Sequence, residues 1–400
     1  MSKKGISLSA LCDMFPLEKY ISYSLQSVPV ESLFISHSSS CEGSESPTPH
    51  DFVLHHIWKD KDLACGMGCI NVGSRLYFFG GQLPVDDQEP PWVYTRENLS
   101  CEVCRYDLSD IVKSHLLSTA SSYVTDIHPS SPPPAQMSAG KSYSIVVEVD
   151  GLIYVLTGSD LVHHCVPDPT FEVYDPCTNK WTSLEAPPFL CEYHQCFFEW
   201  NDYPFPHAVI DKKICVSSVL CSFAFDTRTR KWMTCELFTD FDPSSVLLIE
   251  YPRHSRHSAS RKRYRSVDVM CDPPFAFSGR ALLYGEDILL GYVPSQLPLV
   301  AYQVVQGKVK RMQCLSLGAD CPDCDGLVDL GGGYFCFMYH TLDRVEMTSD
   351  LTLVTFKLSR IDEVVVQGLC AEFLKCDVVS RSTRKIDWEY ACFPIHAFVM

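Results

Sequence analysis

The chain lacks any apolar run of about 18 or more residues, which is the length that a membrane-spanning helix needs. Its N-terminus, MSKKGISLSALCDMF, has only a short apolar stretch and no small-residue cleavage site, so it does not indicate a secretory signal. Basic residues are scarce as well: 33 lysines and arginines stand against 49 aspartates and glutamates, and the formal net charge is -16. We therefore expect an intracellular protein of the cytoplasm, the nucleus or both, with no membrane partner and no general affinity for nucleic acid.

Motifs that mark common catalytic sites are also missing. The sequence has no Gly-x-Gly-x-x-Gly after a strand, no phosphate-binding loop, no Gly-x-Ser-x-Gly and no His-Glu-x-x-His. We predict no catalytic, cofactor-binding or metal-binding residue and no cofactor. Cysteine, in contrast, is abundant. In a chain without a signal peptide, its 21 cysteines are expected to be reduced thiols that act as small buried apolar side chains.

One pattern occurs twice in the middle of the sequence. Residues 171–184 are FEVYDPCTNKWTSL, and residues 222–235 are SFAFDTRTRKWMTC. Each copy has an aromatic residue, an aspartate, a short polar turn and then lysine-tryptophan, with six positions from the aspartate to the tryptophan. Alternating apolar residues on both sides of a polar turn predict a β-hairpin. We expect Trp181 and Trp232 to pack within their own hairpins.

A second strand pair precedes each of these hairpins. The segments SIVVEVDGLIYVLTGS (144–159) and HAVIDKKICVSSV (207–219) each contain two apolar runs joined by a short turn. Four strands in about fifty residues, repeated, are typical of a propeller blade. Weaker copies occupy 68–82 with 101–111, 281–293 with 300–312, and 326–340 with 351–360.

The ends of the chain predict the closing blade. Residues 19–28 and 373–388 look like strands, and a propeller commonly builds one blade from both termini so that no sheet edge stays open. The predicted fold is all-β: a monomeric β-propeller of about six four-stranded blades. Residues 1–50 hold an N-terminal strand and a polar linker, and residues 51–400 hold the propeller.

These repeats resemble a known family. Gly80-Gly81 follows a second strand, Tyr174-Asp175 precedes a turn, and Trp181 follows that turn, which is similar to the kelch repeat. The chain looks like a kelch-type β-propeller of the galactose-oxidase-like superfamily and is similar to the kelch half of plant F-box/kelch proteins. The resemblance implies a scaffold that binds a partner protein, in that family as the recognition subunit of a ubiquitin ligase.

The resemblance does not extend to an F-box. An F-box is helical, with a leucine-proline entry, whereas ISLSALCDMFPLEKYISYSL is followed here by the polar segment HSSSCEGSESPTPHD. A propeller without an F-box can still recognise substrates for a separate ligase. Galactose oxidase itself binds copper through tyrosine and histidine, but this sequence shows no matching ligand motif.

Two Cys-x-x-Cys motifs raise the alternative of a metal or redox site. Cys101 and Cys104 lie in a predicted strand, where positions three apart point to opposite faces, so we expect them in the core. Cys321 and Cys324 flank a Pro-Asp turn that can bring two thiols together as a half-site or redox pair. No second pair at ribbon-like spacing completes a zinc site, and Cys65 and Cys69 are only loosely placed for one.

The segment RHSRHSASRKRYRS, residues 253–266, is a basic island in an acidic chain. It lies between two repeats and predicts an exposed insertion loop. A nuclear import signal or a phosphorylation site is the functional alternative, and nucleic-acid binding is disfavoured because only one aromatic residue interleaves. The residues concerned are Arg261, Lys262, Arg263 and Arg265 for import, Ser258, Ser260 and Ser266 for phosphorylation, and Tyr264 for stacking.

A proline-rich segment, HPSSPPPAQ (128–136), either separates two blades or presents a short polyproline helix to a partner. Taken together, the sequence predicts a non-enzymatic protein-interaction scaffold whose loops bind a partner protein. The alternative is a propeller enzyme or metal-binding protein that uses a central channel.

Overall fold

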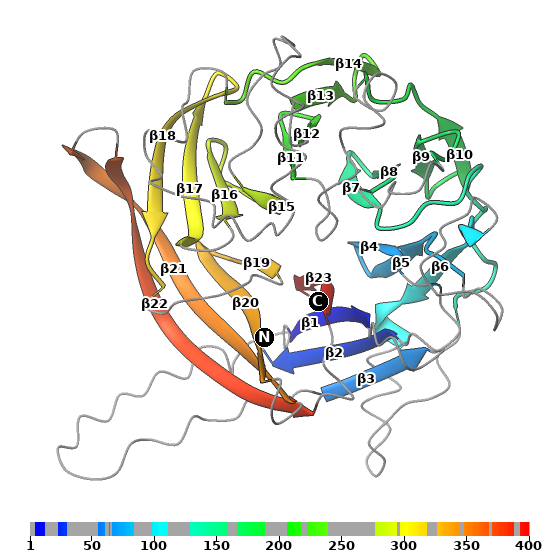
Figure 1. Cartoon of the computed structure of the whole chain (residues 1–400), viewed down its shortest axis with the longest axis horizontal. Helices are drawn as coiled ribbons and strands as arrows, with labels where there is room; N and C mark the ends of the chain where they lie inside the picture. The colour runs from blue at the N-terminus through cyan, green and yellow to red at the C-terminus, as the bar shows by residue number, and fades with distance from the viewer. Residues whose placement is uncertain are drawn as a thin grey trace, which may run out of the picture. The chain divides into compact units, whose positions relative to one another are not determined.

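The computed structural model describes most of the repeats predicted from the sequence (Figure 1). The described residues are 5–12, 23–29, 55–60, 64, 66–83, 98–110, 129–158, 166–188, 206–217, 222–238, 277–293, 297–317, 326–343, 348–367, 370–387 and 393–399. They form strands and turns, with only a few helical residues, such as those at 108–110, so the predicted all-β class is confirmed. Within these residues, no helix has the length and apolar character to cross a membrane.

The chain divides into two compact units. Unit 1 contains Met1–Pro204, Cys324–Ser359 and Lys375–Met400, and unit 2 contains Phe205–Asp323 and Arg360–Leu374. Within each unit, most neighbouring strands are consecutive in the sequence and pair antiparallel.

Unit 1 contains four sets of paired strands. Two are simple meanders, with the strand orders β4-β5-β6 and β10-β9-β8-β7. A third has the order β23-β1-β2-β3, and in a fourth β19 pairs with β20 and β20 with β21. Their bounds are β1 Gly5–Cys12, β2 Tyr23–Pro29, β3 His55–Asp60, β4 Gly68–Val72, β5 Arg75–Phe79, β6 Val103–Asp107, β7 Ile145–Val149, β8 Leu152–Leu156, β9 Phe171–Asp175, β10 Lys180–Ser183, β19 Gly326–Gly331, β20 Tyr334–Asp343, β21 Thr348–Gln367 and β23 Phe393–Val399.

One strand from each of these sets contacts a strand of the next set. Strand β19 contacts β23, β23 contacts β4, and β4 contacts β7 (Figure 1). Unit 1 therefore contains a row of four neighbouring strands, each of which lies at one end of its own set of paired strands.

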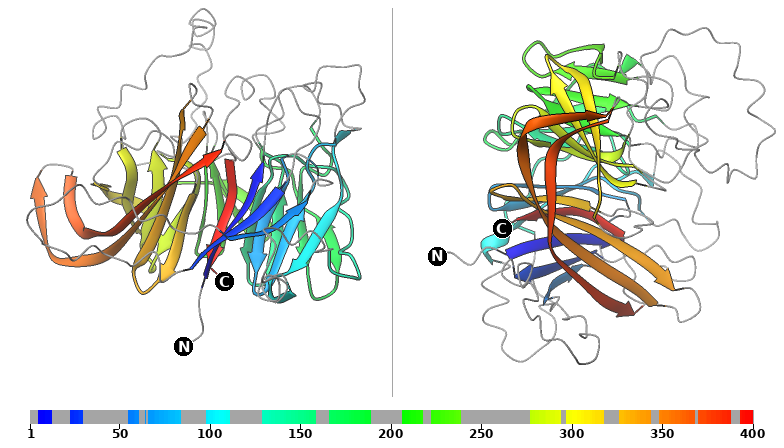
Figure 2. Two further views of the ribbon diagram at one scale, coloured as in Figure 1. Left: turned by 90° about the horizontal axis from the view of Figure 1, so that it is seen from below. Right: turned by 90° about the vertical axis from the view of Figure 1, so that its left-hand side faces the viewer.

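Unit 2 repeats this arrangement. Its strands have the order β14-β13-β12-β11-β15-β16-β17-β18, followed by the first residues of β22, whose remainder from Lys375 onward belongs to unit 1. The first strands of its two meanders, β11 and β15, pair in parallel through His207 and Arg280. Strand β22 is joined to β18 at Met312 and Cys370, and β21 and β22 are long and strongly curved (Figure 2). The bounds are β11 His207–Ile210, β12 Lys213–Ser217, β13 Ser222–Asp226, β14 Lys231–Thr234, β15 Ser278–Tyr284, β16 Ile288–Val293, β17 Leu297–Val305, β18 Lys308–Leu315 and β22 Cys370–Asp387.

Each unit has its own buried apolar cluster, as the alternating strand pattern requires. Inward-facing side chains of neighbouring sheets meet there and exclude water. In unit 1 the cluster contains Ile70, Tyr77, Phe79, Val103, Met137, Val146, Ile153, Val155 and Tyr174. In unit 2 it contains Ala208, Cys215, Ala224, Cys235, Leu237, Phe238, Phe277, Ala281, Leu289, Val300, Tyr302, Val304, Val309 and Met312.

The predicted pairing of the two matching hairpins is confirmed. Tyr174 lies opposite Trp181 in β9 and β10, and Phe225 lies opposite Trp232 in β13 and β14. The ring centroids are 5.0 Å apart in the first pair and 5.2 Å in the second. Both tryptophans are half-buried and pack on the aromatic residue of their own hairpin, which is the role that the sequence predicts.

The C-terminal strand that joins the N-terminus differs from the predicted one. Strand β1 pairs with β23, so the two ends of the chain share a sheet, whereas 373–387 lies in β22, a strand that pairs with β18 at Cys370. Alternating apolar residues occur in both C-terminal segments, and this local pattern cannot specify the partner strand. Strand β1 itself falls in the segment 1–50, ahead of the strand predicted at 19–28, which begins at Tyr23.

The two hairpins share the same spacing for a physical reason: in each, the aspartate side chain holds the turn through hydrogen bonds. Asp175 Oδ1 accepts a hydrogen bond from the backbone N–H of Cys177 (2.8 Å), and Asp226 Oδ1 accepts one from Arg228 (2.8 Å). The hydroxyl of Thr178 and the Cys177 N–H lower the pKa of Asp175, and the Arg228 N–H lowers the pKa of Asp226. Both carboxylates are therefore charged at neutral pH, and both cap their turns in the same way.

The residue before the lysine has a left-handed backbone in both turns. Asn179 has φ 54 and Arg230 has φ 56. Asparagine tolerates this conformation, but a long side chain such as arginine adopts it at a cost. The Asn179 side chain also accepts hydrogen bonds from the Tyr174 hydroxyl (2.7 Å) and from the backbone N–H of Ala135 (2.8 Å). The same turn geometry is thus achieved with different side chains.

We predict opposite effects of glycine at these two matched positions. Arg230→Gly should raise the free energy of unfolding by about 0.5 kcal/mol, because glycine relieves the left-handed strain. Asn179→Gly should lower it by about 1–2 kcal/mol, because two side-chain hydrogen bonds are lost. Urea unfolding of both variants measures the difference, and changes of the same sign would contradict this account of the turns.

Candidate functional site

The structure covers only some of the residues that the sequence proposes for a site. Cys321, Cys324, Cys65 and the basic segment 253–266 lie outside the described residues. Among those it describes, no group of three or more His, Cys, Asp or Glu side chains could hold a metal ion. Nine of the described cysteines are shown as free thiols, and four of these nine, Cys69, Cys215, Cys235 and Cys336, are buried.

Cys101 and Cys104 depart partly from the prediction that both belong to the core. Cys101 precedes β6 rather than lying in it, and both side chains are half-buried. Cys101 packs at the margin of the apolar cluster of unit 1. Burial raises the pKa of its thiol, against the opposing effect of the nearby Lys141 ammonium, so the thiol is protonated at neutral pH.

The best-defined polar site in the described residues surrounds the chain segment that leads into β7. We call residues 129–143 the junction segment. Its first half is fastened to β6 and the residues before it: Ser130 N donates to Arg105 O (2.6 Å), Arg105 Nη2 donates to Pro132 O (3.0 Å), and Met137 N donates to Cys101 O (2.9 Å). The proline-rich stretch is therefore packed along a sheet, with Pro134 buried, and joins two sheets.

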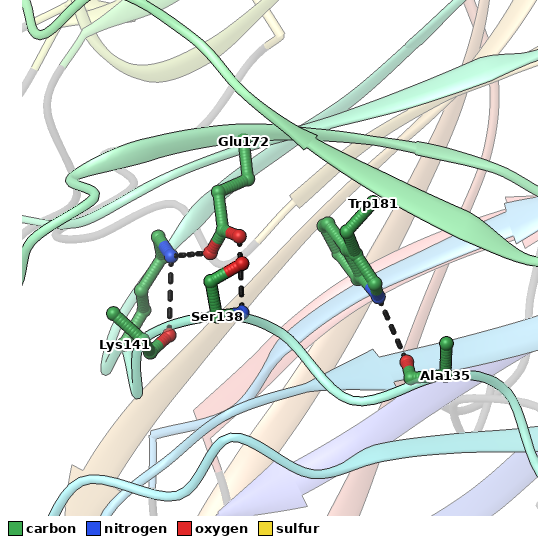
Figure 3. Close-up of polar contacts among 6 residues, drawn as sticks. Ala135, Ser138, Lys141, Glu172 and Trp181 are labelled. Carbon is green, nitrogen blue, oxygen red and sulfur yellow. Dashed lines mark hydrogen bonds and ion pairs between the residues drawn. The ribbon is translucent and has the colours of Figure 1, made fainter.

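The junction segment is also fastened to the β9–β10 hairpin, through Trp181. The indole Nε1 donates a hydrogen bond to Ala135 O at 2.8 Å (Figure 3). The same ring packs edge-on against Phe79 of β5, with centroids 5.9 Å apart, in addition to its contact with Tyr174. Trp181 therefore holds together two neighbouring sheets and the segment between them.

Glycines allow the junction segment to approach β5 and β8 closely. Gly81 N donates to Lys141 O at 2.7 Å, and a Cβ atom added to Gly80 would lie 2.1 Å from that oxygen. A Cβ atom added to Gly158 would lie 1.8 Å from the backbone carbonyl oxygen of Tyr143. Any larger residue would displace the backbone at these positions. The pair Gly80-Gly81, identified in the sequence, therefore leaves room for the backbone that leads into β7.

An ion pair lies at the centre of this site. The Lys141 ammonium contacts the Glu172 carboxylate of β9, and both side chains are 0% exposed (Figure 3). Lys141 Nζ also donates to Ala139 O (3.1 Å), and Ser138 N donates to Glu172 Oε1 (3.0 Å). The pair therefore fixes both the backbone and the side chains of the junction segment against β9.

The electrostatic balance of this pair explains why each charge needs the other. Burial lowers the pKa of Lys141, and the charge and hydrogen bond of Glu172 oppose that effect. A charge taken out of water costs several kcal/mol unless a partner and hydrogen bonds replace the water. Neither side chain has any surface through which a substrate could be contacted. The arrangement suits a structural clamp.

Sequence reasoning missed Lys141 and Glu172, although a signal was present. In the sequence, Glu172 stands between Phe171 and Val173 in a predicted strand, where an acidic side chain is rarely buried without a partner. The structure shows that Phe171 to Tyr174 are all buried. The segment SAGKS supplies that cation 31 positions earlier. The signal indicates that a partner must exist without indicating which of the basic residues it is.

Comparison with known proteins gives limited family information. Residues 87–236 match the model of a family described as "Protein of unknown function (DUF1668)". The matched region contains both copies of the hairpin motif and the junction segment in full. No curated protein matches the sequence.

Solved structures similar to this chain include β-propeller-type folds. Kluyveromyces lactis Hsv2 is 7% identical, with a TM-score of 0.35 and coverage of 96% of this chain and 99% of that one. The N-terminal domain of Nup159 is 9% identical, with a TM-score of 0.30 and coverage of 93% and 82%. The chain also spans 26% of the extracellular domain of a hybrid two-component system, BT4673 from B. thetaiotaomicron, covering 74% of its own length at 10% identity and a TM-score of 0.29.

We predict that the buried pair tolerates loss of both charges better than loss of one. Lys141→Met and Glu172→Leu should each lower the free energy of unfolding by about 3–5 kcal/mol, because each leaves a buried charge without its partner. The double variant should lose less than the sum of the two single losses. Urea unfolding of all three proteins measures this coupling.

An exposed ion pair provides the control for this cycle. Lys375 and Asp377 are 66% and 49% exposed, and Lys375→Met and Asp377→Leu should each change the free energy of unfolding by less than about 1 kcal/mol. Single losses at Lys141 and Glu172 as small as those of the control pair would show that the buried charges do not act as a clamp.

Two substitutions at Trp181 separate its hydrogen bond from its packing. Trp181→Phe removes the donor to Ala135 O and should lower the free energy of unfolding by about 1 kcal/mol. Trp181→Ala also removes the contacts with Phe79 and Tyr174, and because the ring is half-buried we expect a loss of about 2–3 kcal/mol. Thermal unfolding of the two variants measures both effects. Equal melting temperatures for Trp181→Ala and the unchanged protein would contradict the bridging role.

Proposed function

We propose that this chain is a kelch-like β-propeller of about six four-stranded blades and that it acts as a non-enzymatic protein-interaction scaffold. The observation that carries the proposal is that end strands of neighbouring sheets lie side by side within each unit. These strands are β19, β23, β4 and β7 in unit 1, and β11 and β15 in unit 2. In a propeller, the innermost strands of successive blades lie side by side around a central axis in this way. The strand shared by both ends of the chain supports closure of the last blade.

The kelch-like character is supported by two details of the packing. Gly80 and Gly81 receive the backbone that leads into the next sheet, and the aspartate-turn-tryptophan hairpin occurs with one geometry in β9–β10 and β13–β14. Repetition of a close backbone approach and a fixed hairpin produces similar sheets that stack on one another.

The interaction role follows from how the strongest polar contacts are used. The Lys141–Glu172 pair is enclosed, and its contacts hold the scaffold rigid. The turns that connect the strands are exposed and differ in side chains between repeats, as binding loops on a rigid scaffold do. We propose that a monomer binds its partner protein through these turns in the cytoplasm or nucleus, as a substrate-recognition subunit for a separate ubiquitin ligase.

Affinity purification of the intact chain from its own cells tests this function. We expect at least one protein partner at near-stoichiometric amount, including a ligase scaffold, after mass spectrometry of the purified sample. Metal analysis of the same sample provides the opposing outcome. Stoichiometric copper or zinc without a protein partner would overturn the scaffold function in favour of a metal-dependent activity.

A further inference from the structure

Two turns at one end of the β11–β14 sheet gather basic side chains. Lys212 lies in the β11–β12 turn and Lys213 begins β12, while Arg228 and Arg230 lie in the β13–β14 turn and Lys231 begins β14. We call these five residues the basic edge. All except Lys213 are exposed, and Lys213 is half-buried. They form a local concentration of positive charge in a chain whose net charge is -16.

Hydrogen bonds hold the two turns of the basic edge together. Lys212 O accepts hydrogen bonds from Thr227 N (3.2 Å) and Thr227 Oγ1 (2.8 Å). Arg228 Nη2 donates to Asp211 Oδ1 at 2.8 Å, and Asp226 faces Lys213 across the β12–β13 ladder. The positive charges are therefore presented by a fixed backbone, which reduces the entropy lost on binding.

The equivalent turns in the preceding repeat are a matched internal comparison. There the β7–β8 turn is Asp150-Gly151-Leu152, and the β9–β10 turn runs from Asp175 to Lys180. These turns carry one basic and two acidic residues, whereas their counterparts in the basic edge carry five basic and two acidic residues. The backbone pattern is shared and the charge is not, so the fold does not require the positive charge.

Two of these cations occupy strained positions. Lys212 has φ 58 where the preceding repeat has Gly151, and Arg230 has φ 56 where it has Asn179. Glycine and asparagine suit a left-handed backbone, and lysine and arginine do not. Long basic side chains at these two positions therefore lower stability locally, which is typical of positions used for binding.

We propose that the basic edge is a docking surface for a short acidic segment, rich in aspartate and glutamate, of a partner protein. This proposal rests on the scaffold function and specifies the surface and the chemistry of its partner. The two turns touch at Lys212 and Thr227, and their centres are two strand spacings, or about 10 Å, apart. An extended peptide spans that distance in about three or four residues. None of the five side chains is aromatic, so the edge has no stacking platform for nucleic-acid bases.

A direct binding measurement tests the docking surface with a defined probe. The probe is a fluorescein-labelled ten-residue peptide containing four glutamates separated by glycine and serine, and its neutral counterpart has glutamine at those four positions. Fluorescence anisotropy with the full chain should detect the acidic peptide and not the neutral one. Binding should weaken as salt rises from low to physiological ionic strength.

The test variant replaces two cations with the residues of the preceding repeat. Lys212→Gly with Arg230→Asn keeps the left-handed backbone at both positions, and it should weaken acidic-peptide binding about five- to tenfold without lowering the melting temperature. The control variant, Lys180→Gln with Lys375→Gln, removes the same number of charges from unit 1 and should change binding less than twofold. Equal weakening in both variants, or absence of acidic-peptide binding, would overturn the docking surface.

Two further outcomes separate this proposal from others. Tighter binding of a ten-residue oligothymidylate than of the acidic peptide would assign the edge to nucleic acid and overturn the proposed partner. If the intact chain and the Lys212→Gly, Arg230→Asn variant capture the same cellular partners equally, the scaffold function stands and the docking surface fails. Edge-dependent peptide binding by a chain that captures no cellular partner would support the edge and overturn the scaffold function.

Discussion

The close approach of the junction segment to β5 is the constraint on which the described part of unit 1 depends. The carbonyl of Lys141 meets Gly80 and Gly81, and this contact leaves no room for a side chain. Because the junction segment packs so closely against β5, the Lys141 ammonium is buried, and it pairs with the buried Glu172 carboxylate. The buried pair is therefore a consequence of tight packing between sheets, and once formed it makes any other position of the segment unfavourable.

The two copies of the hairpin show which parts of a repeat are fixed and which are free. The aspartate that caps the turn, the left-handed residue and the tryptophan opposite an aromatic ring have the same geometry in both. The side chains differ, with exposed Cys177 in one copy and exposed Arg228 in the other, and the left-handed position itself is occupied by Asn179 in one and Arg230 in the other. Surface chemistry can therefore change from repeat to repeat without a change in the sheets.

Structural features that depend on residues close together in the sequence could be predicted from it. Hairpins such as β9–β10 are specified by an aspartate turn and alternating apolar residues within fourteen positions, and these were predicted in register. The partner of β1 and the Lys141–Glu172 pair could not be predicted, since each depends on a contact between distant segments. Residues 373–388 and 393–399 both suit a strand, and only packing of the whole chain decides which one pairs with β1.

The division between enclosed and exposed charges bears on what this scaffold can do. In a buried pair such as Lys141 and Glu172, the electrostatic attraction is largely offset by the cost of desolvating both charges. The pair therefore fixes the position of the junction segment and offers no surface for binding. Exposed cations on a hydrogen-bonded edge keep their hydration and can exchange it for an acidic partner at small cost. Because strain at Lys212 and Arg230 would be relieved by residues that the preceding repeat already uses, stability alone does not account for the basic edge. Recognition of an acidic segment does, and it places specificity in the turns while the junctions between sheets supply the rigidity.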